Sequence, residues 1–304
     1  MSLLISEKKH KKALCRSVDV PEQKPSFAIG LTEVGISGKT VWILVPEGRI
    51  PFTAAIGVDL PGTVRGIHMS RIEEGIGKLY DIPFPSPKEF CVELGRNVMA
   101  SQQGARCHIR LSGKMPLLRK TRVSGRISLD TVDVTAETTI GVRDGRTIIE
   151  TGTIGLGVCH ITACPCTQAY NQILFGKKGG NVPQPTHSQR SVTRLTIESQ
   201  PAAPSYEQLF DCLDTALHVT HDLMKRPDEA EIVLKSHRFP QFAEDAVREV
   251  ARAAGEIFGG ILPDASRISI ESQSLESIHI HDVSCRLETD LGEILQCLQN
   301  EETA

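Results

Sequence analysis

Alternating apolar and polar positions dominate the first half of the chain and predict extended strands. Residues 26–36 and 40–45 are rich in β-branched side chains, and we expect Gly38-Lys39 between them to form a hairpin turn. Residues 51–59 extend the same pattern. The alternation then returns in four further segments, with Asp144-Gly145 predicted as the hairpin turn between the last two: 106–111, 122–134, 138–142 and 147–155.

Three helices are predicted from capping signals and apolar periodicity. The first begins at Ser86-Pro87-Lys88-Glu89, which combines an N-cap serine, a proline at the first helical position and a glutamate at the third. Ser205 and Gln208 predict a capping box for a second helix, which we expect Pro227 to end. A third, amphipathic helix occupies 242–257 before Gly259-Gly260.

Strands are predicted at 191–198, 267–271 and 277–286, so strands and helices are grouped rather than alternating. This grouping favours an α+β fold over a doubly wound sheet. The length of 304 residues suggests about two domain-sized units. We expect a flexible basic N-terminus over 1–20, a first module over 21–160 and a second over 161–304, although no internal sequence repeat supports a duplication.

The charge balance excludes several classes of partner. Lys plus Arg number 34 and Asp plus Glu number 37, giving a net charge of −3. A chain so balanced is not expected to coat nucleic acid or an anionic membrane. Neither a membrane-spanning apolar stretch nor a secretory signal is recognisable, so we expect a soluble, cytoplasmic protein. The nine Cys are then expected to be thiols rather than disulfides.

The densest group of potential metal ligands or nucleophiles is Cys159-His160-Ile161-Thr162-Ala163-Cys164-Pro165-Cys166. Pro165 is expected to hold the backbone extended, so that the thiols of Cys164 and Cys166 face one side. A structural zinc module is disfavoured because no second Cys pair follows. Buried small residues at a strand end are the alternative interpretation.

Further candidate residues lie in polar segments. His187 and Arg190 stand in a loop ahead of a strand. His279 and His281 are predicted to share one face of a strand, which suits two imidazoles reaching one metal or substrate, and Glu276 joins them only through a turn or bulge.

Three other segments have an ordinary structural interpretation beside the functional one. Residues 225–229 are predicted as a helix C-terminus with cations at the negative end of the dipole. Glu244 is placed on the polar flank of the third helix. Arg65, His68 and Arg71 follow a Pro-Gly turn and form either an anion contact or a charged loop.

Taken together, these segments resemble the type IB GTP cyclohydrolases. The resemblance rests on six segments in the family's order, RGIHMSR (65–71), CPC (164–166), HSQRS (187–191), RPDE (226–229), Glu244 within AEDAVREVA, and ESIHIHD (276–282). It implies a tunnelling fold (T-fold), in which antiparallel sheets are backed by helices, with two modules per chain. It also implies a homo-oligomer, a homotetramer in most members, with active sites between subunits.

The resemblance also implies roles for individual residues, including GTP as the substrate. The implied metal-site residues are Cys164, His187 and Glu229, with His279 approaching the metal or its water. Cys166, Glu276 and His279 match residues near the reacting C8 of GTP. The implied contacts to the rest of the substrate are Glu244 for guanine and His68, Arg71 and Arg190 for the triphosphate.

The chemistry implied is metal-activated opening of the GTP imidazole ring at C8 with release of formate. Fe²⁺ is the first choice, as in the archaeal relatives, although Mn²⁺ and Zn²⁺ accept the same ligand types. The segment 167–186 is longer than in bacterial members, which favours the archaeal product, 7,8-dihydroneopterin 2′,3′-cyclic phosphate. Within it, 176–181 is expected to be a Gly-rich surface loop.

Three alternatives stay open at this point. The first is the same ring opening with 7,8-dihydroneopterin triphosphate as product. The second is another T-fold pterin or deazapurine enzyme, such as a nitrile reductase or a pyruvoyl-pterin synthase. The third is a non-catalytic metal or redox protein that uses Cys164 and Cys166.

Overall fold

The computed structural model describes residues 4–176, 182–200 and 202–302 and contains one eight-stranded sheet. All neighbouring strands are antiparallel and follow one another in chain order. The strands are β1 (Leu31–Val45), β2 (Gly48–Leu60), β3 (Arg106–Lys120), β4 (Ile127–Arg143), β5 (Arg146–Ala163), β6 (Ser188–Glu198), β7 (Arg267–Leu275) and β8 (Val283–Asp290). The fold is therefore α+β, as the sequence predicted.

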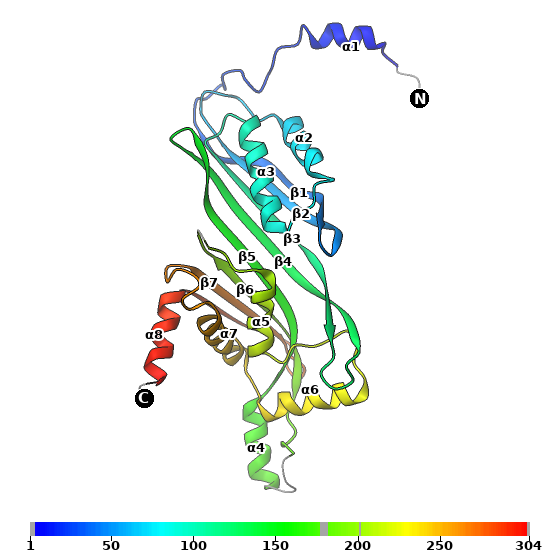
Figure 1. Cartoon of the computed structure of the whole chain (residues 1–304), viewed down its shortest axis with the longest axis vertical. Helices are drawn as coiled ribbons and strands as arrows, with labels where there is room; N and C mark the ends of the chain where they lie inside the picture. The colour runs from blue at the N-terminus through cyan, green and yellow to red at the C-terminus, as the bar shows by residue number, and fades with distance from the viewer. Residues whose placement is uncertain (1–3, 177–181, 201, 303–304) are drawn as a thin grey trace.

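Helices cover one face of this sheet in two groups (Figure 1). The described helices, of which α1 and α4 project away from the sheet, are α1 (Glu7–Leu14), α2 (Met69–Leu79), α3 (Pro87–Ser101), α4 (Pro165–Phe175), α5 (Tyr206–Ala216), α6 (Arg226–Arg238), α7 (Ala243–Phe258) and α8 (Leu291–Glu302). The first group, α2 and α3, packs over β1, β3 and β4, and the second, α5 and α7, packs over β5 to β8. Among the described helices, none is both long enough and apolar enough to cross a bilayer.

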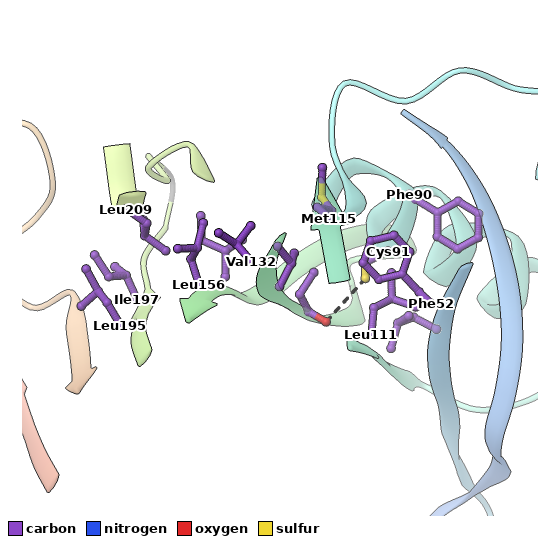
Figure 2. Packing of buried hydrophobic residues seen from close by; sticks show 14 of the residues in the cluster. Phe52, Phe90, Cys91, Leu111, Met115, Val132, Leu156, Leu195, Ile197 and Leu209 are labelled. Carbon is purple, nitrogen blue, oxygen red and sulfur yellow. Dashed lines mark hydrogen bonds between the residues drawn. The ribbon is translucent and has the colours of Figure 1, made fainter. Parts of the chain in front are cut away.

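A continuous hydrophobic core lies between the sheet and both groups of helices. Figure 2 shows Phe52, Phe90 and Leu111 on one side of it and Leu195 and Leu209 on the other. Inward-facing residues alternate along each strand, as expected for a sheet with one covered face. The pairing of β4 with β5 joins the two halves, so residues distant in sequence are held on one rigid surface.

The helix starts predicted at Ser86 and Ser205 and the helix end predicted at Gly259 are confirmed. Ser86 Oγ accepts a hydrogen bond from Lys88 N at 3.2 Å at the start of α3, and Ser205 and Gln208 form a reciprocal capping box at the start of α5. Gly259 follows the last residue of α7. The Asp144-Gly145 turn is also confirmed: both residues have positive φ, at 53° and 71°, and join β4 to β5.

Three strand boundaries differ from the prediction. Gly38 is not in a hairpin turn, because β1 continues through it with a register shift between Ile36 and Lys39. Its φ of 67° identifies a β-bulge, in which one extra residue bends the strand without ending it. Residues 122–134 and 138–142 belong largely to one strand, β4, preceded by a turn. Strand β3 likewise runs on to Lys120 rather than ending at Leu111.

The segment around Pro227 was predicted wrongly. Helix α5 ends at Ala216, and Leu217 is extended. Pro227 occupies the first turn of α6 instead of ending a helix, so 225–229 is an N-terminus and not a C-terminus. Proline is tolerated there because its missing N–H has no intrahelical partner, and Asp228 accepts a hydrogen bond from Lys225 N at 3.0 Å.

Two candidate segments also have a different backbone from the one predicted. Pro165 begins α4, so the chain turns helical at Cys166 instead of remaining extended. Residues 277–282 form the irregular connection between β7 and β8, so His279 and His281 do not lie on a strand. In both cases the chain leaves the sheet at the end of a strand, where the backbone is no longer held by the ladder.

Candidate functional site

The strand ends of β5 and β6 bring Cys164 and His187 together. Ala163 and Ser188 are the last pair of the ladder, and Cys164 and His187 are the next residues outward. Cys164 N donates to His187 O at 3.0 Å, and Thr186 Oγ1 donates to Cys164 O at 2.7 Å. Cys164 and His187, 23 positions apart in sequence (187 − 164), are thus fixed opposite each other.

Cys164 is also the N-cap of α4. Its Sγ lies 3.5 Å from Thr167 N and 3.6 Å from Thr167 Oγ1, and both groups donate to it. The N-terminus of α4 and these donors therefore face the sulfur. A thiolate is the form in which cysteine binds a metal or acts as a nucleophile.

A hydrogen-bonded cluster extends from His187 to the end of β7. His187 Nδ1 lies 3.2 Å from Gln189 Oε1, and Gln189 Nε2 donates to Glu276 Oε1 at 3.1 Å. Ser274 Oγ donates to the same Glu276 oxygen at 3.0 Å. Glu276 Oε2 lies 4.0 Å from His187 Nδ1, and the Glu276 side chain is only 7% exposed. A buried carboxylate is therefore held beside the imidazole of His187.

The β7–β8 connection carries two exposed imidazoles next to this cluster. The ring centroids of His187 and His279 are 6.2 Å apart, and those of His279 and His281 are 5.4 Å apart in a stacked arrangement. Although these histidines are not on a strand, the structure places His279 beside His187 and Glu276. We name Cys164, His187, Gln189, Glu276 and His279 the strand-end cluster.

Two predicted residues point away from it. Cys166 lies in the first turn of α4 and is exposed. Arg190 follows Gln189 on β6, is exposed, and has the opposite side-chain parity, so it faces the surface of the sheet that the helices leave open.

Glu229 lies at the far end of α6 from the cluster. His237, near the C-terminus of α6, has Nε2 at 3.3 Å from Thr186 O, close to Cys164. Glu229 is exposed in the first turn, eight residues earlier, which corresponds to about 12 Å of helix. One chain therefore does not bring Glu229 to Cys164 and His187.

Glu244 also lies apart from the cluster within one chain. It is exposed in the first turn of α7. Burial, followed by the charge of Glu244, raises the pKa of Cys285, so the carboxylate lies near this third residue of β8. The partner of Cys285 on β7 is Ser272, four residues and about 13 Å before Glu276.

His68 and Arg71 at the start of α2 contact acidic side chains from the N-terminal segment. His68 Nε2 lies 3.5 Å from Glu22, and Arg71 lies 3.9 Å from Glu22 and 4.0 Å from Asp19. Among the described residues, Asp19, Glu22 and His68 are the one group of three potential ligands with donor atoms within 4.8 Å of one another. The neighbouring guanidinium disfavours a cation there.

Sequence reasoning missed Gln189, Ser274, Asp19 and Glu22. The signal for the first two was available: His187 and Gln189, like Ser274 and Glu276, are two positions apart and so share a side at a strand end. The acidic pair had no such signal. The predicted surface loop over 176–181 lies, apart from Gly176, outside the described residues.

Comparison with known proteins finds relatives that match most of the chain. GTP cyclohydrolase MptA 1 of Methanocella arvoryzae is 31% identical over 303 residues, covering 91% of this chain and 94% of that protein. GTP cyclohydrolase MptA of Thermoplasma acidophilum is 28% identical over 291 residues, covering 91% and 96%. A uricase structure from Bacillus fastidious aligns with a TM-score of 0.48 at 8% identity, covering 89% of this chain and 94% of that one.

The family model described as type I GTP cyclohydrolase folE2 matches residues 18–285, which include the whole strand-end cluster together with Glu229, Glu244, His68 and Arg71. The relatives are matched over nearly their entire length, so the agreement extends well beyond a shared motif. The chain belongs to the type I GTP cyclohydrolase folE2 family.

Proposed function

We propose that this protein opens the imidazole ring of GTP at C8, releases formate and forms 7,8-dihydroneopterin 2′,3′-cyclic phosphate with diphosphate. The observation that carries the proposal is the pairing of Cys164 with His187 beside Glu276 and His279, inside the range matched by the family. The cyclic phosphate is favoured because the relatives are named MptA, the archaeal type.

The donor set of the cluster fits a divalent metal. Cys164 offers a sulfur that accepts two hydrogen bonds, and His187 has its Nδ1 directed to Gln189, which leaves Nε2 for a ligand. Cys164 and His187 would hold the metal, with Fe²⁺ preferred over Mn²⁺ and Zn²⁺. Bound there, the metal would supply a Lewis acid that activates water for hydrolysis.

The protein's own groups then handle protons and orientation. Glu276, buried and fixed by Gln189 and Ser274, is suited to hold a proton taken from water, and the exposed imidazole of His279 is suited to pass one to the leaving nitrogen. Glu244 would accept hydrogen bonds from the N–H edge of guanine. We also propose that Cys166 acts near C8 and that His68, Arg71 and Arg190 contact the triphosphate.

Those assignments are compatible with one another only in an assembly. Glu229 lies about 12 Å along α6 from His237, the end of that helix nearest Cys164. Glu244 lies near Cys285, whose partner Ser272 precedes Glu276 by about 13 Å of strand. We therefore propose a homotetramer of T-fold chains, each with two modules, whose sites combine residues of different subunits. Exposed apolar side chains on α4, beside Cys164, support such an interface: Tyr170, Ile173, Leu174 and Phe175.

The proposal is tested by anaerobic reconstitution. Metal-free protein is loaded separately with Fe²⁺, Mn²⁺ and Zn²⁺ and given GTP, and formate and pterin products are quantified by mass spectrometry. We expect formate with a cyclic phosphate and diphosphate. Formate with dihydroneopterin triphosphate would keep the ring opening and reject the product, whereas unconsumed GTP with every metal would reject the function.

A further inference from the structure

Gln189 connects the proposed metal ligand His187 to the buried Glu276. Its Oε1 faces His187 Nδ1 at 3.2 Å, and its Nε2 faces Glu276 Oε1 at 3.1 Å and Ser274 Oγ at 3.3 Å. Each polar atom of the amide therefore has a partner in the cluster. Glu229, Glu244 and the acidic residues near His68 have no contact with this amide among the described residues.

The surroundings fix which way the amide points. Glu276 is a carboxylate that only accepts, so the amide nitrogen must face it, and a flipped amide would set oxygen against oxygen. Ser274 reinforces this orientation because its hydroxyl donates to Glu276 at 3.0 Å and is free to accept from Gln189. Thr162 lies behind Ser274, at 3.3 Å, and bonds Ser191 at 2.8 Å.

The sheet holds Gln189 in place. It pairs with Thr162 on β5, and the register that pairs Arg190 with Leu275 on β7 puts Gln189 opposite Glu276. Ser191 and Ser274, the next residues inward, are at most 1% exposed. The amide is thus built on rigid strands rather than on the β7–β8 connection.

The orientation of the Gln189 amide determines which ring nitrogen of His187 carries the proton. An amide oxygen accepts only, so His187 must carry its proton on Nδ1, and its lone pair is then on Nε2. A neutral imidazole binds metal through the unprotonated nitrogen, and the partner of the other nitrogen sets the ring's orientation and affinity.

We propose that Gln189 is a positioning residue that holds His187 in the Nδ1–H form, with Nε2 directed to the metal, and at the same time orients the Glu276 carboxylate. This inference rests on the proposed metal-dependent function. Gln189 itself touches neither metal nor substrate; it acts by linking a ligand to a proton-handling group.

Co²⁺ titration of metal-free protein tests this without GTP, because thiolate-to-cobalt absorption reports the site directly. Gln189→Leu removes both contacts, and we expect its Co²⁺ affinity to fall about 10- to 100-fold. The exchange Gln189→Glu with Glu276→Gln keeps an acceptor for His187 Nδ1–H and an N–H···O contact between the two side chains, and we expect it to retain most of the affinity. Gln208→Leu, in the capping box of α5, is the matched control and should bind as the parent does.

The outcomes separate the two proposals. An unchanged Co²⁺ affinity in Gln189→Leu, or an equal loss in the exchanged pair, would overturn the positioning role, as would absence of cobalt–thiolate absorption in the parent. If the affinities follow the expected order but the Fe²⁺ enzyme consumes no GTP, the positioning role stands and the cyclohydrolase proposal fails. The exchanged pair is nearly isosteric with the parent, so it keeps the test decisive if Gln189→Leu does not fold.

Discussion

At the scale of single residues, burial distinguishes structural histidines from those of the site. His160 is fully buried on β5, with Nε2 at 2.7 Å from Thr193 Oγ1, and burial, followed by nearby His218, lowers its pKa to about 4. His187 and His279, by contrast, lie beyond the ends of strands β6 and β7. The Cys159–Cys166 run thus contains a core histidine and a candidate ligand only four positions apart.

His160 should make the fold sensitive to mild acid. Its pKa is lower in the folded protein than the value of about 6.5 in the unfolded chain, so the unfolded state takes up the proton first. The contribution of neutral His160 to the free energy of unfolding is therefore fully present above about pH 6.5 and is lost as the pH falls towards 4. Between pH 7.5 and pH 5 the contribution lost is about 2 kcal/mol.

Urea unfolding of the parent and of His160→Gln at the two pH values measures this effect. The glutamine keeps a hydrogen bond to Thr193 and does not titrate, so the parent should lose about 2 kcal/mol more than the variant. Equal losses would show that His160 is not kept neutral by the fold. Comparing the loss within each protein removes the direct cost of the substitution.

At the scale of elements, the start of α6 depends on one aspartate. Asp228 accepts hydrogen bonds from Val123 N at 3.0 Å, Ser124 N at 2.9 Å and Ser124 Oγ at 2.6 Å, as well as from Lys225 N. It therefore caps α6 and also fastens that helix to the turn between β3 and β4.

Asp228→Ala should release α6 and this turn together, because four donors lose their acceptor. We expect faster amide hydrogen exchange over 121–126 and 226–238 and a lower melting temperature, with the central strands still protected. Glu231→Ala, an exposed change on the same helix, is the control and should leave exchange unchanged. If only α6 lost protection from exchange, Asp228 would not couple this helix to the turn between β3 and β4.

At the scale of the whole molecule, the distance between Glu229 and the strand-end cluster predicts complementation between inactive chains. Cys164→Ala and Glu229→Ala should each be inactive alone. If a site takes Cys164 from one subunit and Glu229 from another, co-expression should restore activity at about a quarter of the sites, since both residues must be intact in different chains.

Cys164→Ala co-expressed with His187→Ala is the matched control. Those two residues face each other in the same chain, so mixing their variants cannot rebuild a site. Activity in the first pair but not in the second would establish shared sites. Two inactive pairs would exclude Glu229 as a group contributed by a neighbouring subunit.

The sequence by itself determined features that depend on neighbouring residues. The Ser86 and Ser205 caps, the Asp144-Gly145 turn and the amphipathic α7 were predicted correctly because each is set by contacts within a few positions. The family resemblance likewise followed from short motifs in order. The α+β class followed from the grouping of these local patterns.

Only the tertiary structure decided where these motifs meet. Pro165 and Pro227 look like helix breakers locally, yet both begin helices, since the strand end or the Asp228 contacts define what precedes them. Gln189 and Ser274 acquire their roles from strand register, which depends on pairing across the sheet. The separation of Glu229 from Cys164 was equally invisible in sequence, because it is set by the direction in which α6 packs rather than by residue spacing.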